Sequence, residues 1–235
     1  MAPAEPTVSA GAVTDLAPSS RRPGRWDVSV DGRVVGAVSL ELVERVGLRV
    51  GRVLDDAAAA LVADGIAEVS VYDRALAMLA ARARSSRDLR QRLVRAGAAP
   101  APVDAAVARL EASQLLDDAA YARQVARSRV ATRGDSRRRV TQALAQAGVA
   151  RDTADEAVAD VFVDEAVDEV ALVEQAARKR ARTLGALAPE VRRRRLYGYL
   201  ARRGHDASLI RAVVDRVLGG DSSEASVDGT EDDEA

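Results

Sequence analysis

An apolar residue, a second one four places later, and a glycine four places after that recur three times along the chain. The copies are Leu-Leu-Gly at 89, 93 and 97, Val-Leu-Gly at 140, 144 and 148, and Leu-Leu-Gly at 196, 200 and 204. Positions four apart share one face of an α-helix, and a glycine after that face is typical of a helix end. The spacing therefore predicts a repeated helical unit. It also predicts a buried apolar stripe, formed by Leu89, Leu93, Leu144, Leu196 and Leu200.

The same pattern of flanking residues accompanies each copy. This pattern predicts that residues 72–218 form three units of three helices. Two more apolar positions follow ten and thirteen places after each glycine. Turn and capping residues separate the helices, and Ser85, three places before Asp88, is typical of a helix start. The expected boundaries are residues 72–116 for repeat 1, 117–165 for repeat 2 and 166–218 for repeat 3. The first helix of repeat 1 is expected at residues 71–84.

The pattern is different before the repeats. Apolar and polar residues alternate on both sides of Asp31-Gly32, and Asp-Gly between such runs favours a two-residue hairpin turn. A short helix is expected from Ser39 to about Gly47. A second helix is expected over residues 54–64, closed by Gly65, followed by a short third strand at 67–71. Residues 25–71 are thus predicted to form a small α+β element.

The two ends have compositions that do not favour a packed structure. Residues 1–24 contain four prolines among Gly, Ser and Ala, and residues 219–235 hold seven Asp and Glu with no Lys or Arg. We expect a disordered leader and a disordered acidic tail. The predicted fold class is mainly α: three tandem three-helix repeats forming an elongated array, preceded by a small β-hairpin/helix element.

Composition narrows the possible classes of protein. The chain has 235 residues, of which 48% are hydrophobic, 30% charged and 3% aromatic, and it has no cysteine. Disulfides and thiolate metal sites are therefore excluded. No apolar stretch is long enough to span a membrane and no secretory signal is recognisable, so a cytoplasmic protein is expected. There is no phosphate-binding glycine loop and no nucleophile motif, so we expect neither an enzyme nor a cofactor.

Charge is distributed unevenly. Residues 72–218 contain 28 Lys and Arg against 19 Asp and Glu, although the whole chain has a net charge of −1. A basic repeat array suits an acidic or polyanionic partner, whereas the preference for Arg over Lys also fits genome-wide codon bias. His205 directly follows the helix-ending Gly204, which favours a turn or cap residue over a catalytic base.

The candidate partner-binding residues are the basic side chains of repeats 2 and 3 that lie off the apolar stripe. Arginine pairs in a bidentate manner with phosphate or carboxylate. A merely solvated face is the simpler interpretation of any single arginine, whereas the set as a whole favours a functional basic surface. The candidates are Arg123, Arg127, Arg133, Arg137, Arg138, Arg139, Arg178, Lys179, Arg182, Arg192, Arg193, Arg194, Arg202 and Arg203.

Several stretches of the sequence resemble those of the RecX regulatory family. Residues 115–122 (LLDDAAYA), followed by 133–137 (RGDSR), Leu144 and Gly148, are similar to its signature around the second unit. Residues 75–97 resemble the first unit of the family, and residues 48–54 resemble the region before the repeats in its longer members. The resemblance covers about residues 25–218. Tyr121 stands where the family commonly has Phe, arginine replaces most lysine, and the leader and acidic tail lie outside the family pattern.

The resemblance implies a curved helical array that lies in the groove of the RecA–DNA filament. It further implies inhibition of the recombinase, ATPase and coprotease activities of RecA, and so modulation of DNA repair, recombination and the SOS response. A monomer is expected, with weak contact to single- or double-stranded DNA at most. The alternative is a helical-repeat protein that binds DNA directly through phosphate contacts.

Overall fold

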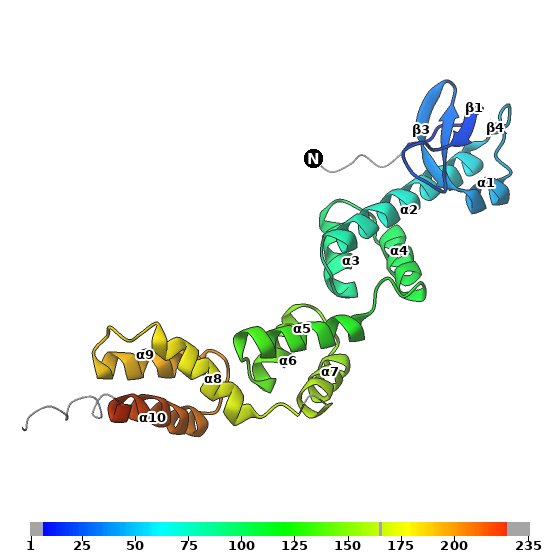
Figure 1. Ribbon diagram of the computed structural model, residues 1–235. Coiled ribbons are helices and arrows are strands. Elements are labelled where there is room, and N and C mark those ends of the chain that lie inside the picture. Colours follow the sequence, from blue (N-terminus) through cyan, green and yellow to red (C-terminus); the bar gives the residue numbers. More distant parts are fainter. Residues whose placement is uncertain (1–6, 165, 225–235) are drawn as a thin grey trace, which may run out of the picture. The chain divides into compact units, whose positions relative to one another are not determined.

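The computed structural model describes residues 7–164 and 166–224, with side chains described as far as Gly219. The chain forms two compact units, Met1–Asp117 and Asp118–Ala235. The first unit contains a four-stranded sheet and repeat 1, and the second contains repeats 2 and 3 (Figure 1). Within the described ranges the protein is mainly helical, as predicted.

The N-terminal sheet is antiparallel, with strand order β3-β2-β1-β4. Its strands are β1 (Gly11–Pro18), β2 (Arg25–Val30), β3 (Arg33–Ser39) and β4 (Val53–Leu54). Asp31 and Gly32 join β2 to β3 with φ of 48° and 77°, so the predicted hairpin turn is confirmed. Helix α1 (Leu40–Val46) starts at the Ser39 cap and ends at Gly47, also as predicted.

The prediction of a disordered leader over residues 1–24 is wrong for residues 11–18. These residues form β1, which pairs with β2 on one side and with β4 on the other. Val13 is buried in the sheet core together with Val28 and Val38. The strand depends on neighbours that are distant in the sequence, so its local proline-rich composition did not reveal it.

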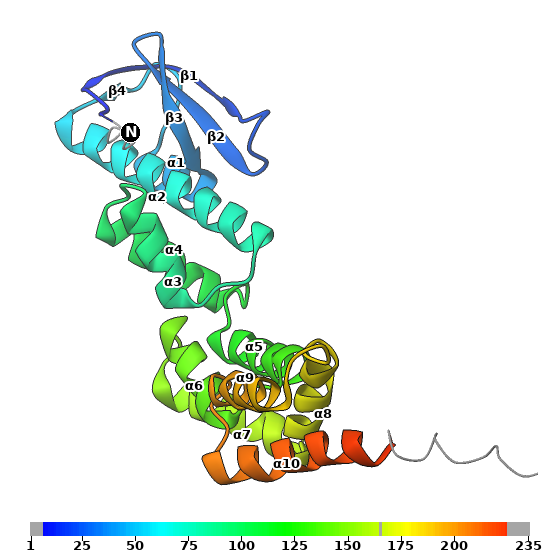
Figure 2. The same cartoon turned by 90° about the vertical axis from the view of Figure 1, so that its left-hand side faces the viewer.

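The expected break at Gly65 and the expected strand at 67–71 are also wrong. One helix, α2 (Asp56–Ala81), runs through both positions and continues into repeat 1. Gly65 lies inside this helix, and a Cβ there would overlap Cδ2 of the buried Leu42 on α1. Its missing side chain therefore serves close packing between helices rather than a helix end. Figure 2 shows the sheet lying over α1 and the N-terminal half of α2.

The other helices form the three predicted repeats. They are α3 (Ser86–Arg95) and α4 (Pro100–Ala112) in repeat 1, α5 (Asp118–Arg133), α6 (Arg137–Gln146) and α7 (Arg151–Asp164) in repeat 2, and α8 (Glu169–Arg182), α9 (Pro189–Ala201) and α10 (Ala207–Glu224) in repeat 3. Helix α10 extends through Glu224, so the disordered tail does not start at Gly219 as expected. Residues 225–235 lie outside the described part.

The apolar stripe forms the cores of the repeats, as predicted. Leu89, Leu93, Leu144, Leu196 and Leu200 are all 0% exposed, and each repeat encloses its own cluster of buried side chains. The three recurring glycines, Gly97, Gly148 and Gly204, have φ of 89°, 86° and 83°. This left-handed conformation strongly favours glycine and ends the middle helix of each repeat.

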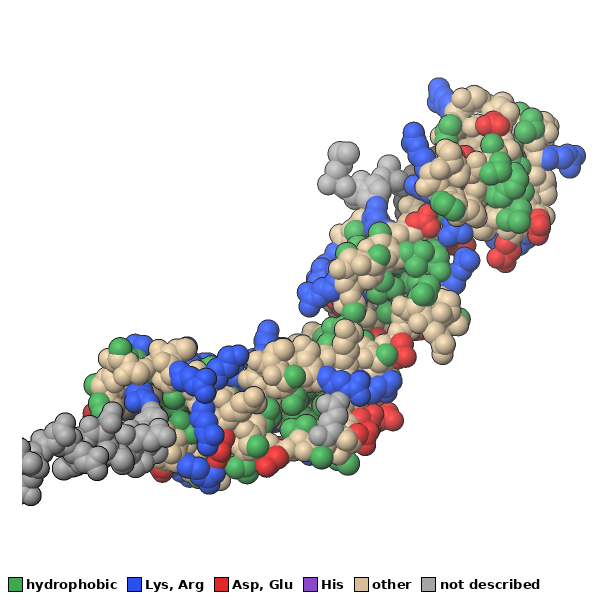
Figure 3. Space-filling view, in the orientation of Figure 1, with side chains coloured by type: hydrophobic (Ala, Val, Ile, Leu, Met, Phe, Trp, Pro, Cys, Tyr) green, Lys and Arg blue, Asp and Glu red, His purple; other side chains and the backbone are tan. Residues whose placement is uncertain are grey.

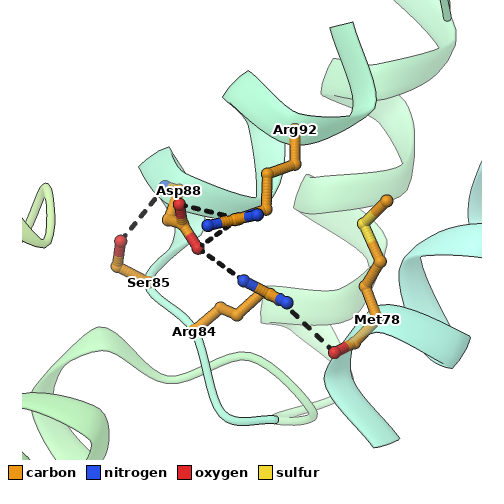
Figure 4. Close-up of polar contacts among 5 residues, drawn as sticks. All are labelled: Met78, Arg84, Ser85, Asp88 and Arg92. Atoms are coloured by element: carbon orange, nitrogen blue, oxygen red, sulfur yellow. Dashed lines mark hydrogen bonds and ion pairs between the residues drawn. The ribbon is translucent and has the colours of Figure 1, made fainter. Parts of the chain in front are cut away.

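The corner between α2 and α3 is held by polar side chains (Figure 4). Ser85 caps α3 by accepting a hydrogen bond from the Asp88 N–H at 3.1 Å. The Asp88 carboxylate accepts hydrogen bonds from Arg84 and Arg92, each at 2.9 Å. Burial alone would raise the pKa of Asp88, but the two arginines outweigh it and hold the pKa below its usual value. The corner is therefore most stable with Asp88 ionised.

No helix in the described ranges combines the length and apolar character needed to cross a membrane. The same residues contain no group of three or more His, Asp or Glu side chains arranged to hold a metal ion.

Candidate functional site

Basic side chains are numerous on the second unit. Figure 3 shows many Lys and Arg side chains on one of its faces, with fewer Asp and Glu between them. The structure separates the predicted candidates into residues that build the joint between repeats 2 and 3, residues paired elsewhere, and exposed residues without a partner.

The joint between repeats 2 and 3 is formed by two loops, one between α5 and α6 and one between α9 and α10. The Ser136 N–H, at the cap of α6, donates to the Arg203 carbonyl at 3.0 Å. Arg203 Nε donates in turn to the Arg133 carbonyl. Gly204 lies so close that a Cβ on it would be 2.7 Å from Ser136 Oγ. The two repeats are therefore joined by direct contacts between these two loops.

His205 lies inside this joint and is 7% exposed. Its Nε2 donates to the Gly134 carbonyl at 2.7 Å, and its buried Nδ1 has no hydrogen-bond partner among the described atoms. Burial lowers the pKa of His205, while the hydrogen bond to Gly134 and the charges of Glu169 and Asp135 act in the opposite direction. The lowered pKa favours a neutral imidazole near pH 7, and the position of His205 between α9 and α10 agrees with the predicted turn role.

Three predicted arginines contribute side-chain contacts at or beside the joint. Arg137 pairs with Glu169 at 2.8 Å and lies over the Phe162 ring, 4.6 Å from its centroid. The Arg203 guanidinium is 3.7 Å from the centroid of Tyr199. Arg139 donates to Gln142 at 2.6 Å, and its Cβ would be 3.1 Å from a Cβ on Gly204. Each of the three arginines therefore already has a hydrogen-bonding or aromatic partner within the protein.

Two candidates on α8 and α9 also have acidic partners. Arg178 pairs with Glu174 at 3.4 Å, and Arg193 pairs with Asp215 of α10. Both arginines remain more than half exposed, so water screens these pairs and a partner could displace them. Arg127 is exposed on α5, and Arg192 is half-buried on α9.

The remaining candidates are available for a partner. Among the described residues their side chains have no ion pair, hydrogen bond or ring contact, and all are exposed except the half-buried Arg123. They are Arg123, Arg133, Arg138, Lys179, Arg182, Arg194 and Arg202. Two of them, Arg138 and Arg202, directly precede residues of the joint in the sequence.

The helical units match family models with the descriptions "RecX, first three-helix domain" at residues 72–110, "RecX, second three-helix domain" at 117–158 and "RecX, third three-helix domain" at 167–214. Together these matches cover more than half of the chain. The chain belongs to the RecX family.

Curated RecX relatives support this assignment over most of their own length. The chain is 38% identical over 152 residues to the "Regulatory protein RecX" of Halorhodospira halophila, covering 64% of this chain and 89% of the relative. It is 32% identical over 154 residues to the "Regulatory protein RecX" of Chlorobaculum tepidum, covering 66% of this chain and 92% of the relative. These relatives are regulatory proteins by name, and a regulatory role follows for this chain.

Two solved RecX structures share the fold. One, described as "Crystal structure of regulatory protein RecX", has a TM-score of 0.67 and 23% identity, covering 87% of this chain and 98% of its own. The structure of RecX from Lactobacillus salivarius has a TM-score of 0.52 and 16% identity, covering 64% of this chain and 96% of its own.

The joint in this RecX protein includes residues that the sequence did not single out. Phe162, Tyr199 and Glu169 contact candidate arginines that lie 32 or fewer positions away, and His205 binds the Gly134 carbonyl 71 positions away. An aromatic residue in a chain with only 3% aromatics is a weak signal that could have pointed to the first two. No local pattern reveals the contact between His205 and Gly134.

Proposed function

We propose that this chain binds the RecA nucleoprotein filament and inhibits the recombinase, ATPase and coprotease activities of RecA. On this proposal it modulates DNA repair, recombination and the SOS response. Its membership of the RecX family carries the proposal, because three consecutive RecX domains account for nearly all of the repeat region.

The charges on the second unit supply a physical basis for such binding. Arg138, Arg194 and Arg202 are exposed and have no partner among the described residues. A planar guanidinium with free donors pairs well with carboxylates of a protein or with phosphates of a nucleic acid. Several such groups on consecutive repeats suit a long partner that presents repeated acidic groups.

The direct test is RecA-dependent ATP hydrolysis on single-stranded DNA, measured while this chain is titrated into the reaction. We expect hydrolysis to fall at less than one copy of the chain per RecA. Unchanged hydrolysis at equimolar protein would contradict the proposal. RecA-dependent cleavage of a repressor substrate and strand exchange would then be measured under the same conditions.

Direct DNA binding is separated from filament binding by a second measurement. Non-specific binding through phosphates has Kd values on the order of 10⁻⁴–10⁻⁶ M near physiological salt and weakens steeply as salt rises. The anisotropy of labelled single- and double-stranded DNA is measured at the same chain concentrations without RecA. Inhibition at concentrations where bare DNA stays unbound supports the filament as target. Inhibition that follows DNA occupancy supports the alternative instead.

A further inference from the structure

We propose that the acidic segment at residues 225–235 docks on a basic face of α8 and there competes with other acidic partners. The competition, but not the docking, rests on the proposed function. The basic face is defined here as the outward residues of α8 at positions 171, 174, 175, 178, 179 and 182.

These six residues form one continuous stripe. Their spacing by three and four places puts them on one side of the helix, and together they line a hollow of about 530 Å³. The opposite side of α8 is buried through Val173, Ala177 and Ala181. The stripe is therefore the outer face of a helix whose inner face is already occupied by the core.

The stripe has an excess of positive charge. Arg178, Lys179 and Arg182 are exposed, and Glu174 is the only carboxylate that lines the hollow. Glu174 is already shared, because Arg178 and Arg216 of α10 both pair with it. Lys179 and Arg182 have no partner among the described residues. The stripe and Arg216 beside it thus hold four cations and one carboxylate, and further negative charge would be favourable there.

The segment at 225–235 has the complementary charge. It contains five carboxylates, at positions 228, 231, 232, 233 and 234, and no Lys or Arg. Its few apolar side chains do not favour burial in a core, whereas ion pairs with arginine and lysine at a surface require no burial.

The connection between the segment and the stripe is short. Helix α10 packs along α8 (Figure 2), and Arg216 of α10 reaches Glu174. From Arg216 to the end of α10 at Glu224 the helix advances by about 12 Å. Eleven further residues span up to roughly 36–40 Å when extended, whereas the stripe is only about 17 Å long. Such a tether gives an effective concentration on the order of millimolar, so weak ion pairs suffice.

The cations of the stripe also have a simpler use, which the experiment must separate from docking. Lys179 and Arg182 lie in the last turn of α8, where positive charge stabilises the helix end. That role involves α8 alone and does not depend on residues 225–235. A measurement of the distance between the segment and α8 distinguishes the two.

The distance can be measured because the chain contains no cysteine. Ala171→Cys on the stripe and Thr230→Cys in the segment provide two unique positions for spin labels, and double electron–electron resonance reports their separation. We expect a population at short distance at about 50 mM salt that disappears near 1 M salt, where the Debye length is about 3 Å.

A charge-matched pair of variants gives the control. Arg178→Gln, Lys179→Gln and Arg182→Gln are combined in one protein, and Arg82→Gln, Arg87→Gln and Arg95→Gln in another. The second set removes three exposed cations from the first unit. We expect the short distance to be lost in the first variant and kept in the second. Equal distance distributions in both, or a distribution insensitive to salt, would overturn the docking.

The competition is tested with a chain that lacks residues 225–235. We expect the concentration needed for half-inhibition of RecA-dependent ATP hydrolysis to fall by at least about threefold relative to the full chain, because the tethered competitor is absent. Equal half-inhibition by a chain whose docking has been detected would overturn the competition. If neither protein inhibits RecA, the proposed function fails, and the distance measurement still decides the docking.

Discussion

Single arginines that look equivalent in the sequence have different surroundings in the structure. Arg137, Arg139 and Arg203 make contacts at or beside the joint between repeats 2 and 3, whereas Arg138 and Arg202 are exposed without partners. Replacing the first kind tests the fold, and replacing the second kind tests the interface. A run such as 137–139 therefore has to be dissected one residue at a time.

Arg138→Glu is the substitution that tests the interface most directly. We expect it to raise the half-inhibiting concentration in the RecA ATPase assay by about three- to tenfold, because an exposed cation becomes an anion facing an acidic partner. Arg151→Glu on α7, whose parent side chain is 89% exposed, is the matched control and should inhibit like the unmodified chain. Equal inhibition by a folded Arg138→Glu protein would exclude this residue from the interface.

His205 makes a prediction about pH. Because its pKa is lowered in the folded protein, the unfolded chain binds a proton first as the pH falls below about 6.5. The contribution of neutral His205 to the free energy of unfolding is therefore fully present above that pH. It is lost as the pH falls toward the lowered pKa. The effect can be assigned, since His205 is the only histidine.

The measurement compares the unmodified chain with His205→Gln between about pH 7.5 and 5.5. Glutamine keeps an N–H donor for the Gly134 carbonyl but does not titrate in this range. We expect the urea midpoint of the second unit to fall with pH in the unmodified chain and to stay nearly constant in the variant. Parallel pH profiles would show that His205 does not titrate in this way.

At the scale of elements, the helix ends were the most readable feature of the sequence. Asp31-Gly32, Ser39, Ser85, Ser136 and the three recurring glycines all take the turn or cap positions that their chemistry favours. Elements that depend on residues distant in the sequence were not predicted from local sequence patterns. β1 needs β2 and β4 beside it, and the reason for a glycine within α2 at position 65 is visible only in its packing against Leu42 of α1.

Gly204 is the helix end with a second role, because it also touches the neighbouring repeat. Alanine there would keep the left-handed φ of 83° and place its Cβ 2.7 Å from Ser136 Oγ. Gly51 has a similar φ of 85°, but nothing lies within 4 Å of a Cβ on it. Gly51→Ala therefore isolates the cost of the backbone conformation, which is about 1 kcal/mol.

We expect Gly204→Ala to destabilise the second unit by about 2 kcal/mol or more, since the contact between the repeats adds to the backbone cost. Gly51→Ala should cost the first unit about half as much. Chemical denaturation of both variants gives the comparison. Equal losses in the free energy of unfolding would mean that the joint accommodates the added methyl group without further destabilisation.

For the whole molecule, the main consequence of the fold is the division into two compact units. Each buried cluster belongs to one unit only: the sheet and repeat 1 clusters to the first, and those of repeats 2 and 3 to the second. A chain with separate cores need not unfold in one step. Stability therefore has to be assigned to each unit.

Matched core substitutions test this division. Leu93 and Leu144 occupy equivalent places in repeats 1 and 2, and both are 0% exposed. Truncation to alanine removes contacts worth about 3 kcal/mol, which corresponds to a fall in Tm of roughly 10 °C for a unit of this size. We expect Leu93→Ala to shift the transition of the first unit and Leu144→Ala that of the second, followed by calorimetry. A single transition that both variants shift equally would show one cooperative molecule.

The sequence by itself determined the repeat, its buried stripe and most of its helix ends, because helical periodicity and capping act over a few residues. The resemblance in those same residues also led to the RecX family. Only the tertiary structure decided that β1 is a strand, that α2 is continuous, and which arginines belong to the joint. These features depend on contacts between residues tens of positions apart, such as His205 with Gly134 and Arg137 with Glu169. Local propensity carries no information about such contacts, since they form only when the chain is packed.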